Sequence, residues 1–315
     1  MTILIYGAGA IGSTFGGFLS RDHDVTLLGR KRHLEAIRRR GLRVAGIWGR
    51  HVFRRFRFET DFKKIIKEKM TFDLILVTVK SFDTENAAKA IRKILTPQTR
   101  VVSLQNGLGN VEALERHLPK NQILAGRVIF GVEVPKPDAV KITVMADPTA
   151  VGEIAVKKIT PRVRKIAALF SRAGVPAYAF PDVESKLWSK VIYNSALNPL
   201  ASLLEVHYGE LMEHAQTRAV MDEVIAEIYE VAHRAKICLT PPTPAVYRKL
   251  FYAQMVPRTY DHHPSMLQDL QKGKRTEIDS LNGAVVKLGK RYRIPVPVNR
   301  MLAGLIRKKE RLCLR

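Results

Sequence analysis

Six consecutive residues near the start of the chain are suited to holding a phosphate group. They read Gly7, Ala8, Gly9, Ala10, Ile11 and Gly12, and they lie between an apolar run and a helical segment. The first glycine permits a tight turn, the second lets the backbone approach a pyrophosphate, and the third lets helix pack against strand. The phosphates then lie at the helix N-terminus, where backbone N–H groups favour an anion. The sequence therefore predicts a dinucleotide site at residues 7–12.

The residues after the second expected strand bear on which dinucleotide binds. An NAD-binding unit has an acid there, which accepts from the ribose 2′-hydroxyl, but this chain has Gly29-Arg30-Lys31-Arg32. Because guanidinium matches phosphate in charge and geometry, Arg30 favours a 2′-phosphate and hence NADP(H). Lys31 and Arg32 can equally be read as exposed bases. Lys80, directly after the expected strand 73–79, is a second candidate at the same sheet edge, and its alternative is a solvated charge.

A polar stripe interrupts an otherwise apolar helix expected over Val183–Leu204. Lys190, Asn194 and Asn198 recur at intervals of four and so share one face of this helix. Polar side chains in apolar surroundings need partners, since an unmade hydrogen bond costs about 1–3 kcal/mol. Two structural alternatives stay open: the lysine extends to the surface, and the asparagines cap backbone at a kink caused by Pro199.

Two later residues have simple structural interpretations. Ser265 and Gln268 have the spacing of a capping box, as do Thr276 and Asp279. Glu277 would complement the helix dipole in a first helical turn. Spacing alone favours these structural roles over a catalytic or substrate-binding role.

The elements that must position these residues fall into two groups. Up to about residue 131, short runs rich in Val, Ile and Leu alternate with helical stretches, a pattern typical of a parallel sheet. The expected strands are Thr2–Tyr6, Val25–Leu28, Asp73–Val79, Arg100–Leu104 and Gln122–Ala125, with 140–144 and 150–153 as edge strands.

Beyond residue 180, helical periodicity continues almost to the end. The expected helices are Val183–Leu204, Glu210–Lys236, Pro244–Val256, Ser265–Gln271, Glu277–Arg291 and Pro297–Glu310. The predicted fold is therefore α/β: a Rossmann-type doubly wound sheet over residues 1–180 and an all-helical domain over 181–315.

Charge and composition limit the partners. Lys and Arg number 53 against 29 Asp and Glu, a formal net charge of +24, which attracts anions of every kind. The basic residues are spread along the chain among acids, so we interpret them as a solvated surface and do not expect a nucleic-acid partner. Cys238 and Cys313 fit no metal or disulfide pattern, and no uninterrupted run is long enough to span a membrane. We expect a cytoplasmic protein without a membrane partner; a homodimer stays open.

Taken together, these segments resemble the ketopantoate reductase (2-dehydropantoate 2-reductase) family, which performs the NADPH step of pantothenate and coenzyme A synthesis. The matching stretches occur in family order and span most of the chain. They are GAGAIG at 7–12, VTVKS at 77–81, QNGLGN at 105–110, KLWSKVIYNSALNPL at 186–200 and SMLQDLQKGKRTEID at 265–279.

The resemblance implies a role for each matching position. Gly7, Gly9 and Gly12 hold the pyrophosphate, Arg30 and Lys80 face the adenosine phosphate, and Asn106 lies near the nicotinamide. Lys190 is the general acid, Asn194, Asn198 and Ser265 hold a small 2-oxo acid, and Glu277 is a second catalytic carboxylate. Hydride then adds to the 2-keto carbon while Lys190 protonates the oxygen, and Glu277 helps to keep the lysine charged.

Some segments depart from the family pattern. Residues 135–139 and 146–148 contain prolines where the family is glycine-rich, and His262-His263-Pro264 before Ser265 is unusual. These departures bear on the substrate more than on the reaction. Two alternatives therefore remain: a reductase of another branched 2-oxo acid, and a nucleotide-binding regulator without turnover.

Overall fold

The computed structural model describes residues 1–313, which form two compact units. The first unit comprises Met1–Gln105 and Asn110–Val183, and the second comprises Asn106–Gly109 and residues 184–313. The second unit thus includes four residues, 106–109, that the sequence placed in the first domain.

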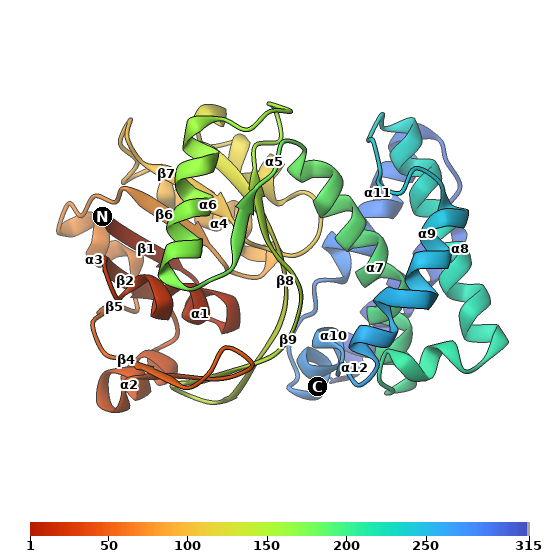
Figure 1. The fold of residues 1–315 in the computed structure, drawn as a ribbon, viewed down its shortest axis with the longest axis horizontal. Helices are drawn as coiled ribbons and strands as arrows, with labels where there is room; N and C mark the ends of the chain where they lie inside the picture. Colours follow the sequence, from red (N-terminus) through yellow and green to blue (C-terminus); the bar gives the residue numbers. More distant parts are fainter. Residues whose placement is uncertain (314–315) are drawn as a thin grey trace. The chain divides into compact units, whose positions relative to one another are not determined.

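A single ten-stranded sheet forms the framework of the first unit (Figure 1). Strand β1 (Thr2–Tyr6) pairs in parallel with β2 (Asp24–Leu28) and with β6 (Leu74–Val77). Strands β7 (Arg100–Ser103) and β8 (Ile123–Lys136) continue the parallel order beyond β6. Strand order therefore reverses at β1, and in such sheets ligands bind at the carboxyl ends of the strands beside the reversal.

The other half of the sheet is a long hairpin that the sequence pattern did not reveal. Strand β8 runs on to Lys136, and β9 (Ala139–Gly152) returns antiparallel to it. The two edge strands expected at 140–144 and 150–153 are wrong, because both belong to β9, which lies inside the sheet between β8 and β3 (Leu42–Gly46). Register shifts along the hairpin move side chains from one face to the other, which obscures the period of two.

Three short strands complete the sheet. Strand β4 (His51–Phe53) pairs with β3, β5 (Arg57–Glu59) with β2, and β10 (Ala177–Ala179) with β9.

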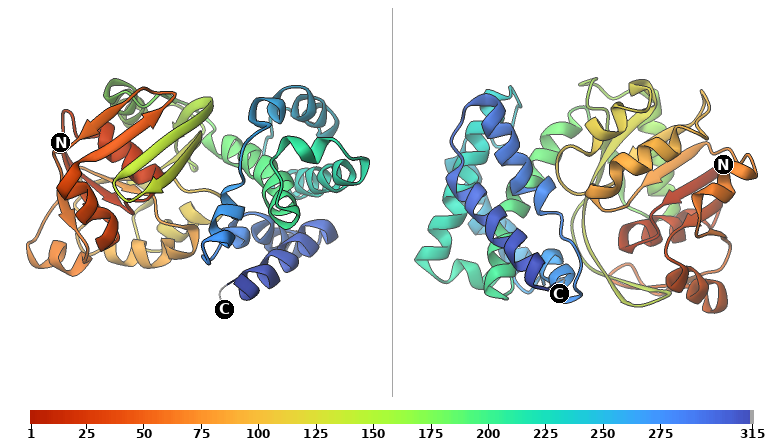
Figure 2. Two further views of the ribbon diagram at one scale, coloured as in Figure 1. Left: turned by 90° about the horizontal axis from the view of Figure 1, so that it is seen from below. Right: turned by 180° about the vertical axis from the view of Figure 1, so that it is seen from behind.

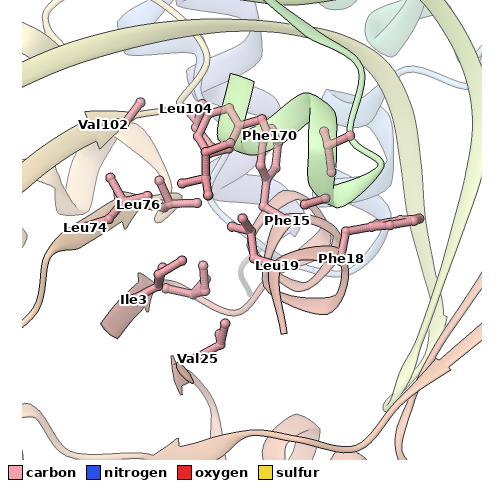
Figure 3. Packing of buried hydrophobic residues seen from close by; sticks show 14 of the residues in the cluster. Ile3, Phe15, Phe18, Leu19, Val25, Leu74, Leu76, Val102, Leu104 and Phe170 are labelled. Atoms are coloured by element: carbon pink, nitrogen blue, oxygen red, sulfur yellow. The ribbon is translucent and has the colours of Figure 1, made fainter. Parts of the chain in front are cut away.

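Helices bury both faces of this sheet. On one face α1 (Ala10–Leu19) and α6 (Pro161–Ala173) pack together, with the rings of Phe15 and Phe170 4.9 Å apart, edge to face (Figure 3). Alternate strand residues such as Leu4 and Ile75 are also fully buried but face the other way. The remaining helices of this unit are α2 (Lys31–Arg40), α3 (Phe62–Lys67), α4 (Thr84–Ile91) and α5 (Asn110–Glu115). Burial on both faces confirms the predicted doubly wound class.

Among the described residues of the second unit, the regular elements are all helices (Figure 2). The α-helices are α7 (Val183–Leu204), α8 (Ala215–Arg234), α9 (Pro244–Leu250), α10 (Ser265–Gln271), α11 (Asn282–Tyr292) and α12 (Pro297–Cys313). The continuous helix expected over Glu277–Arg291 is wrong: a short 3-10 helix, Ile278–Ser280, precedes α11, and Leu281 between them has non-helical φ −102° and ψ −109°. Within residues 1–313, no helix has both the length and the hydropathy needed to cross a bilayer.

Candidate active site

The glycine turn follows β1, and each of its three positions has a different structural reason to be glycine. Gly7 has φ +112°, and a Cβ there would lie 2.7 Å from the Val79 nitrogen. A Cβ at Gly12 would lie 2.3 Å from the Gly7 carbonyl oxygen, so both positions must be glycine for the backbone to pack. A Cβ at Gly9 would meet only that same oxygen, at 4.0 Å. Gly9 therefore leaves open space in front of the turn, which a side chain would fill.

This open space faces the start of α1. Gly9 is the N-cap residue of that helix and supplies no side chain to bond the first N–H groups. Both Gly7 and Ala8 donate their N–H to the Leu28 carbonyl, at 3.1 and 2.8 Å, which ties the turn to the end of β2. The next N–H groups, of Ala10 and Ile11, belong to the first helical turn, as anion binding requires. The turn thus fits a dinucleotide pyrophosphate.

Basic residues occupy the place after β2 where an NAD site has an acid. Arg30 is the N-cap residue of α2, is exposed, and forms no ion pair with the residues that the structure describes. The acid nearest in the sheet is Glu59, opposite Leu28 in the register of β5 and β2. Its buried carboxylate is already engaged by Arg57 at 3.2 Å and Lys64 at 3.3 Å.

Lys80 follows β6 on the other side of β1. It comes directly after Val79, whose backbone packs on Gly7, so it lies close to the glycine turn in the chain. The structure therefore places the turn, Arg30 and Lys80 after three adjacent parallel strands.

A buried polar cluster that the sequence did not single out lies after β7. The Gln105 side-chain nitrogen donates to the Val79 carbonyl at 3.0 Å and to the Thr84 hydroxyl at 2.7 Å. The Thr84 hydroxyl in turn lies 2.8 Å from Asn110 Oδ1. Gln105 and Asn110, which flank residues 106–109, are thereby bonded to the same threonine. In the sequence they are the two ends of the stretch QNGLGN, and nothing local indicates that they share a partner.

In the second unit, three of the predicted site residues meet. Lys190 Nζ, from α7, donates to Asn106 Oδ1 at 2.6 Å, and Asn106 Nδ2 donates to Glu277 Oε2 at 3.4 Å. Asn106, which the resemblance associated with the cofactor, thus lies between the two proposed catalytic groups. We refer to Lys190, Asn106 and Glu277 as the polar triad.

The segment 106–109 is held against the 3-10 helix that follows Glu277. Leu108 N–H donates to the Ser280 carbonyl at 2.8 Å. Gly107 has φ +84°, and a Cβ there would lie 2.4 Å from that carbonyl oxygen. Only glycine permits this approach, which fixes Asn106 beside Glu277.

A buried carboxylate holds the other side of Glu277. Glu310 of α12 accepts from the Thr276 backbone N–H at 2.7 Å and from the Thr276 hydroxyl. The expected capping box of Thr276 and Asp279 is only half formed: the Thr276 hydroxyl accepts from the Ile278 N–H at 3.2 Å, but the Thr276 N–H bonds Glu310 and not Asp279. Glu310 lies in the run Lys308-Lys309-Glu310-Arg311, which looks like exposed surface, so no local signal identified it.

The remaining substrate candidates form no hydrogen bonds of this kind. Asn198 is 3% exposed and its Oδ1 has no partner within residues 1–313, while Asn194 is half-buried. The expected capping by Ser265 is wrong: Pro264 is the N-cap residue of α10, Ser265 is the exposed first residue, and no side chain caps the helix.

One other proton donor lies next to Asn194 on α7. Burial raises the pKa of Tyr193 to about 12, although its hydrogen bond with Thr259 acts in the opposite direction. Tyr193 therefore stays protonated near neutral pH, and it is a weaker acid than a lysine ammonium.

Comparisons with known proteins agree along the whole chain. The family model "Ketopantoate reductase PanE/ApbA" matches residues 3–155, and its C-terminal model matches residues 182–310. The 2-dehydropantoate 2-reductase of Aquifex aeolicus is 39% identical, over 98% of this chain and 97% of that protein. The enzyme of the same name from Pyrococcus abyssi is 35% identical, over 99% of both chains.

Two solved structures extend the comparison. A ketopantoate reductase of the PanE/ApbA family from Ralstonia eutropha JMP134 superposes with a TM-score of 0.87 at 32% identity, covering 100% of both chains. A D-mandelate dehydrogenase in complex with NADH and anilino(oxo)acetate superposes with a TM-score of 0.83 at 26% identity, over 99% of both chains.

Proposed function

The chain belongs to the ketopantoate reductase family, and from that premise we propose that it reduces 2-dehydropantoate (ketopantoate) to pantoate with NADPH. This reaction would place it in pantothenate and coenzyme A synthesis. The observation that carries the proposal is the polar triad, in which an ammonium, an amide and a carboxylate are hydrogen-bonded in sequence. A protein that only binds a nucleotide has no need of this arrangement.

Residues of the first unit would hold the cofactor. The N–H groups at the start of α1 would bind the pyrophosphate over Gly9, with Gly7 and Gly12 shaping the turn. Arg30 would pair with the 2′-phosphate, because its guanidinium is exposed and the neighbouring acid Glu59 is occupied by other cations. Lys80 would add a second positive charge at the same edge of the sheet.

The polar triad would supply the proton for the reduction. When bound, the nicotinamide supplies the hydride that adds to the 2-keto carbon. Lys190 would donate a proton to the oxygen that becomes the hydroxyl, and the ammonium would stabilise negative charge developing there. Asn106 would aim the ammonium, because its Oδ1 accepts from Lys190 while its Nδ2 is anchored on Glu277.

Side chains of α7 and α10 would select the substrate. The buried Asn198 Oδ1 is an acceptor that needs a donor, and the 4-hydroxyl of ketopantoate would supply one. Asn194 and Ser265 would donate to the carboxylate. Both cysteines are free and exposed, which suits the cytoplasmic location that we also propose.

A panel of 2-oxo acids tests this substrate. We expect kcat/KM, measured by NADPH consumption, to be highest for ketopantoate. Trimethylpyruvate, which is ketopantoate without its hydroxyl, should react about 10- to 100-fold less efficiently, because it leaves a buried acceptor unpaired. Equal or better use of trimethylpyruvate or phenylglyoxylate would contradict the substrate and favour a reductase of another 2-oxo acid. Absence of turnover with every acid would instead support a nucleotide-binding regulator.

The coenzyme is tested separately. NADPH should have a higher kcat/KM than NADH, and Arg30→Ala should reduce that preference mainly by raising the KM for NADPH. Arg39→Ala is the matched control, since Arg39 is exposed on the last turn of the same helix. An NADH preference in the unmodified protein, or equal effects of the two substitutions, would overturn the assignment of Arg30.

A further inference from the structure

Pro199 creates a defect in the helix that carries Lys190, Asn194 and Asn198. It lies inside α7, and proline has no N–H to donate to the carbonyl four residues earlier, which is that of Ser195. Ser195 is fully buried, so water cannot replace the missing donor. A buried carbonyl without a partner costs about 1–3 kcal/mol.

A side chain from another helix supplies the missing hydrogen bond. Asn282, the first residue of α11, donates from Nδ2 to the Ser195 carbonyl oxygen at 3.1 Å. Asn282 is itself fully buried, and its Oδ1 has no partner within residues 1–313. Burying this amide therefore costs free energy that an apolar residue would not cost. The hydrogen bond to the Ser195 carbonyl is what the amide contributes in return.

A chain of hydrogen bonds fixes which way the Asn282 amide points. The Glu227 carboxylate of α8 accepts from the backbone N–H groups of Val298 and Asn299 at 2.7 and 2.9 Å, and from Asn299 Nδ2 at 2.7 Å. Since a carboxylate only accepts, Asn299 must present its nitrogen to Glu227 and its oxygen to Asn282. Asn282 Nδ2 bonds this oxygen at 3.0 Å, so the nitrogen also faces Ser195.

We propose that Asn282 is a positioning residue for the reaction. It secures α7 at the carbonyl between Asn194 and Asn198, where the helix would otherwise be free to bend. The directions of Lys190 and of the two asparagines relative to each other then depend on this hydrogen bond. The inference rests on the proposed function for its effect on turnover, but the hydrogen bond can be tested without any substrate.

The sharpest test restores the missing backbone donor. In Asn282→Ala the Ser195 carbonyl loses its partner, and we expect kcat to fall about 10-fold or more while the KM for NADPH is unchanged. Adding Pro199→Ala gives position 199 an N–H that can bond Ser195, so the double variant should recover at least half of the lost kcat on a logarithmic scale. Val285→Ala, which removes buried methyl groups elsewhere in α11, should lower the Tm but not kcat.

Hydrogen exchange gives a readout that does not need turnover. Amides of α7 around residue 199 should exchange faster in Asn282→Ala and return toward normal in the double variant. If the unmodified protein reduces no 2-oxo acid, the proposed function fails, and exchange still decides whether Asn282 secures the helix.

Three results would overturn the inference. One is a kcat for Asn282→Ala that matches the unmodified protein, whatever its Tm. A second is a double variant no better than Asn282→Ala in both kcat and exchange. If Asn282→Ala does not fold, the double variant is purified directly: its folding supports the inference, and its failure to fold, with Pro199→Ala alone folded, contradicts it.

Discussion

At the scale of single residues, the proposed chemistry depends on where the Lys190 ammonium group is held. Lys190 lies on a largely buried helix and is itself half-buried, and its Nζ is 2.6 Å from the Asn106 amide oxygen. The alternative of a surface lysine required a side chain with no specific acceptor. The hydrogen bond to Asn106 supports the proposed role as proton donor.

Replacing Lys190 should therefore remove catalysis and leave cofactor binding intact. In Lys190→Met, which keeps the stem but not the charge, we expect kcat to fall by about two to four orders of magnitude, the usual contribution of a positioned general acid. NADPH affinity, measured by fluorescence titration, should change little, because the proposed phosphate contacts belong to the first unit. Near-normal turnover by this variant would show that Lys190 is not the proton donor.

Residues that act locally could be predicted from the sequence, whereas their distant partners could not. The glycine turn and the stripe of Lys190, Asn194 and Asn198 follow from spacing within one element. Glu310 and Asn282 form hydrogen bonds with residues 34 and 87 positions away, and no local sequence pattern indicates such partners. Both are polar residues in amphipathic helices, where the ordinary expectation is a solvated side chain.

At the scale of elements, a histidine connects the hairpin of β8 and β9 to the helices α1 and α2. The Asp138 backbone N–H donates to His33 Nδ1 at 3.3 Å, so Nε2 carries the proton and can donate to the Ser13 hydroxyl 3.0 Å away. Ser13 is on α1 and His33 on α2. A neutral His33 therefore connects both helices to the turn between the two strands.

His33 predicts a pH dependence of stability. Burial lowers its pKa, and the charge of Asp138 only partly opposes this. Below about pH 6.5 the unfolded chain takes up a proton that the folded chain resists, so the free energy of unfolding should fall as the pH decreases below this value. Urea unfolding at several pH values measures this slope.

The contribution of His33 can be separated from other titrations. Burial raises the pKa of Asp138, but hydrogen bonds from Arg40 and Arg43 outweigh this and hold it below the usual range, so Asp138 stays charged throughout this window. His33→Gln should flatten the slope, and His23→Gln, a substitution in the same unit, should not. An unchanged slope in His33→Gln would refute the assignment.

The strands that the sequence missed share a physical reason. Strands β3, β4 and β5 are three to five residues long and carry Arg43, His51 and Arg57, so no apolar run marks them. The core strands β1, β6 and β7 are buried on both faces and are nearly continuous in apolar residues. Strands of this kind were predicted close to their observed bounds.

At the scale of the whole molecule, the charge of +24 needs an interpretation. If it is a solvated basic surface, duplex DNA should bind only non-specifically, with a Kd of about 10⁻⁶ M or weaker at physiological salt, and binding should weaken steeply as salt increases. Fluorescence anisotropy with two unrelated duplexes over a salt series measures both properties. Tight, salt-resistant binding that distinguishes the two sequences would instead favour the alternative of a regulator without turnover.

The grouping of residues 106–109 with the helices has a consequence for how the chain is made. Asn106 is synthesised long before Lys190 and Glu277. Glu310, which bonds Thr276 next to Glu277, is synthesised later still. Translation therefore completes the sheet strands while Asn106 still lacks both of its partners. A cut after Val183 would leave no fragment with the whole triad, because Asn106 would be in one piece and Lys190 in the other. All three members of the polar triad are present only once the chain has been synthesised as far as Glu277.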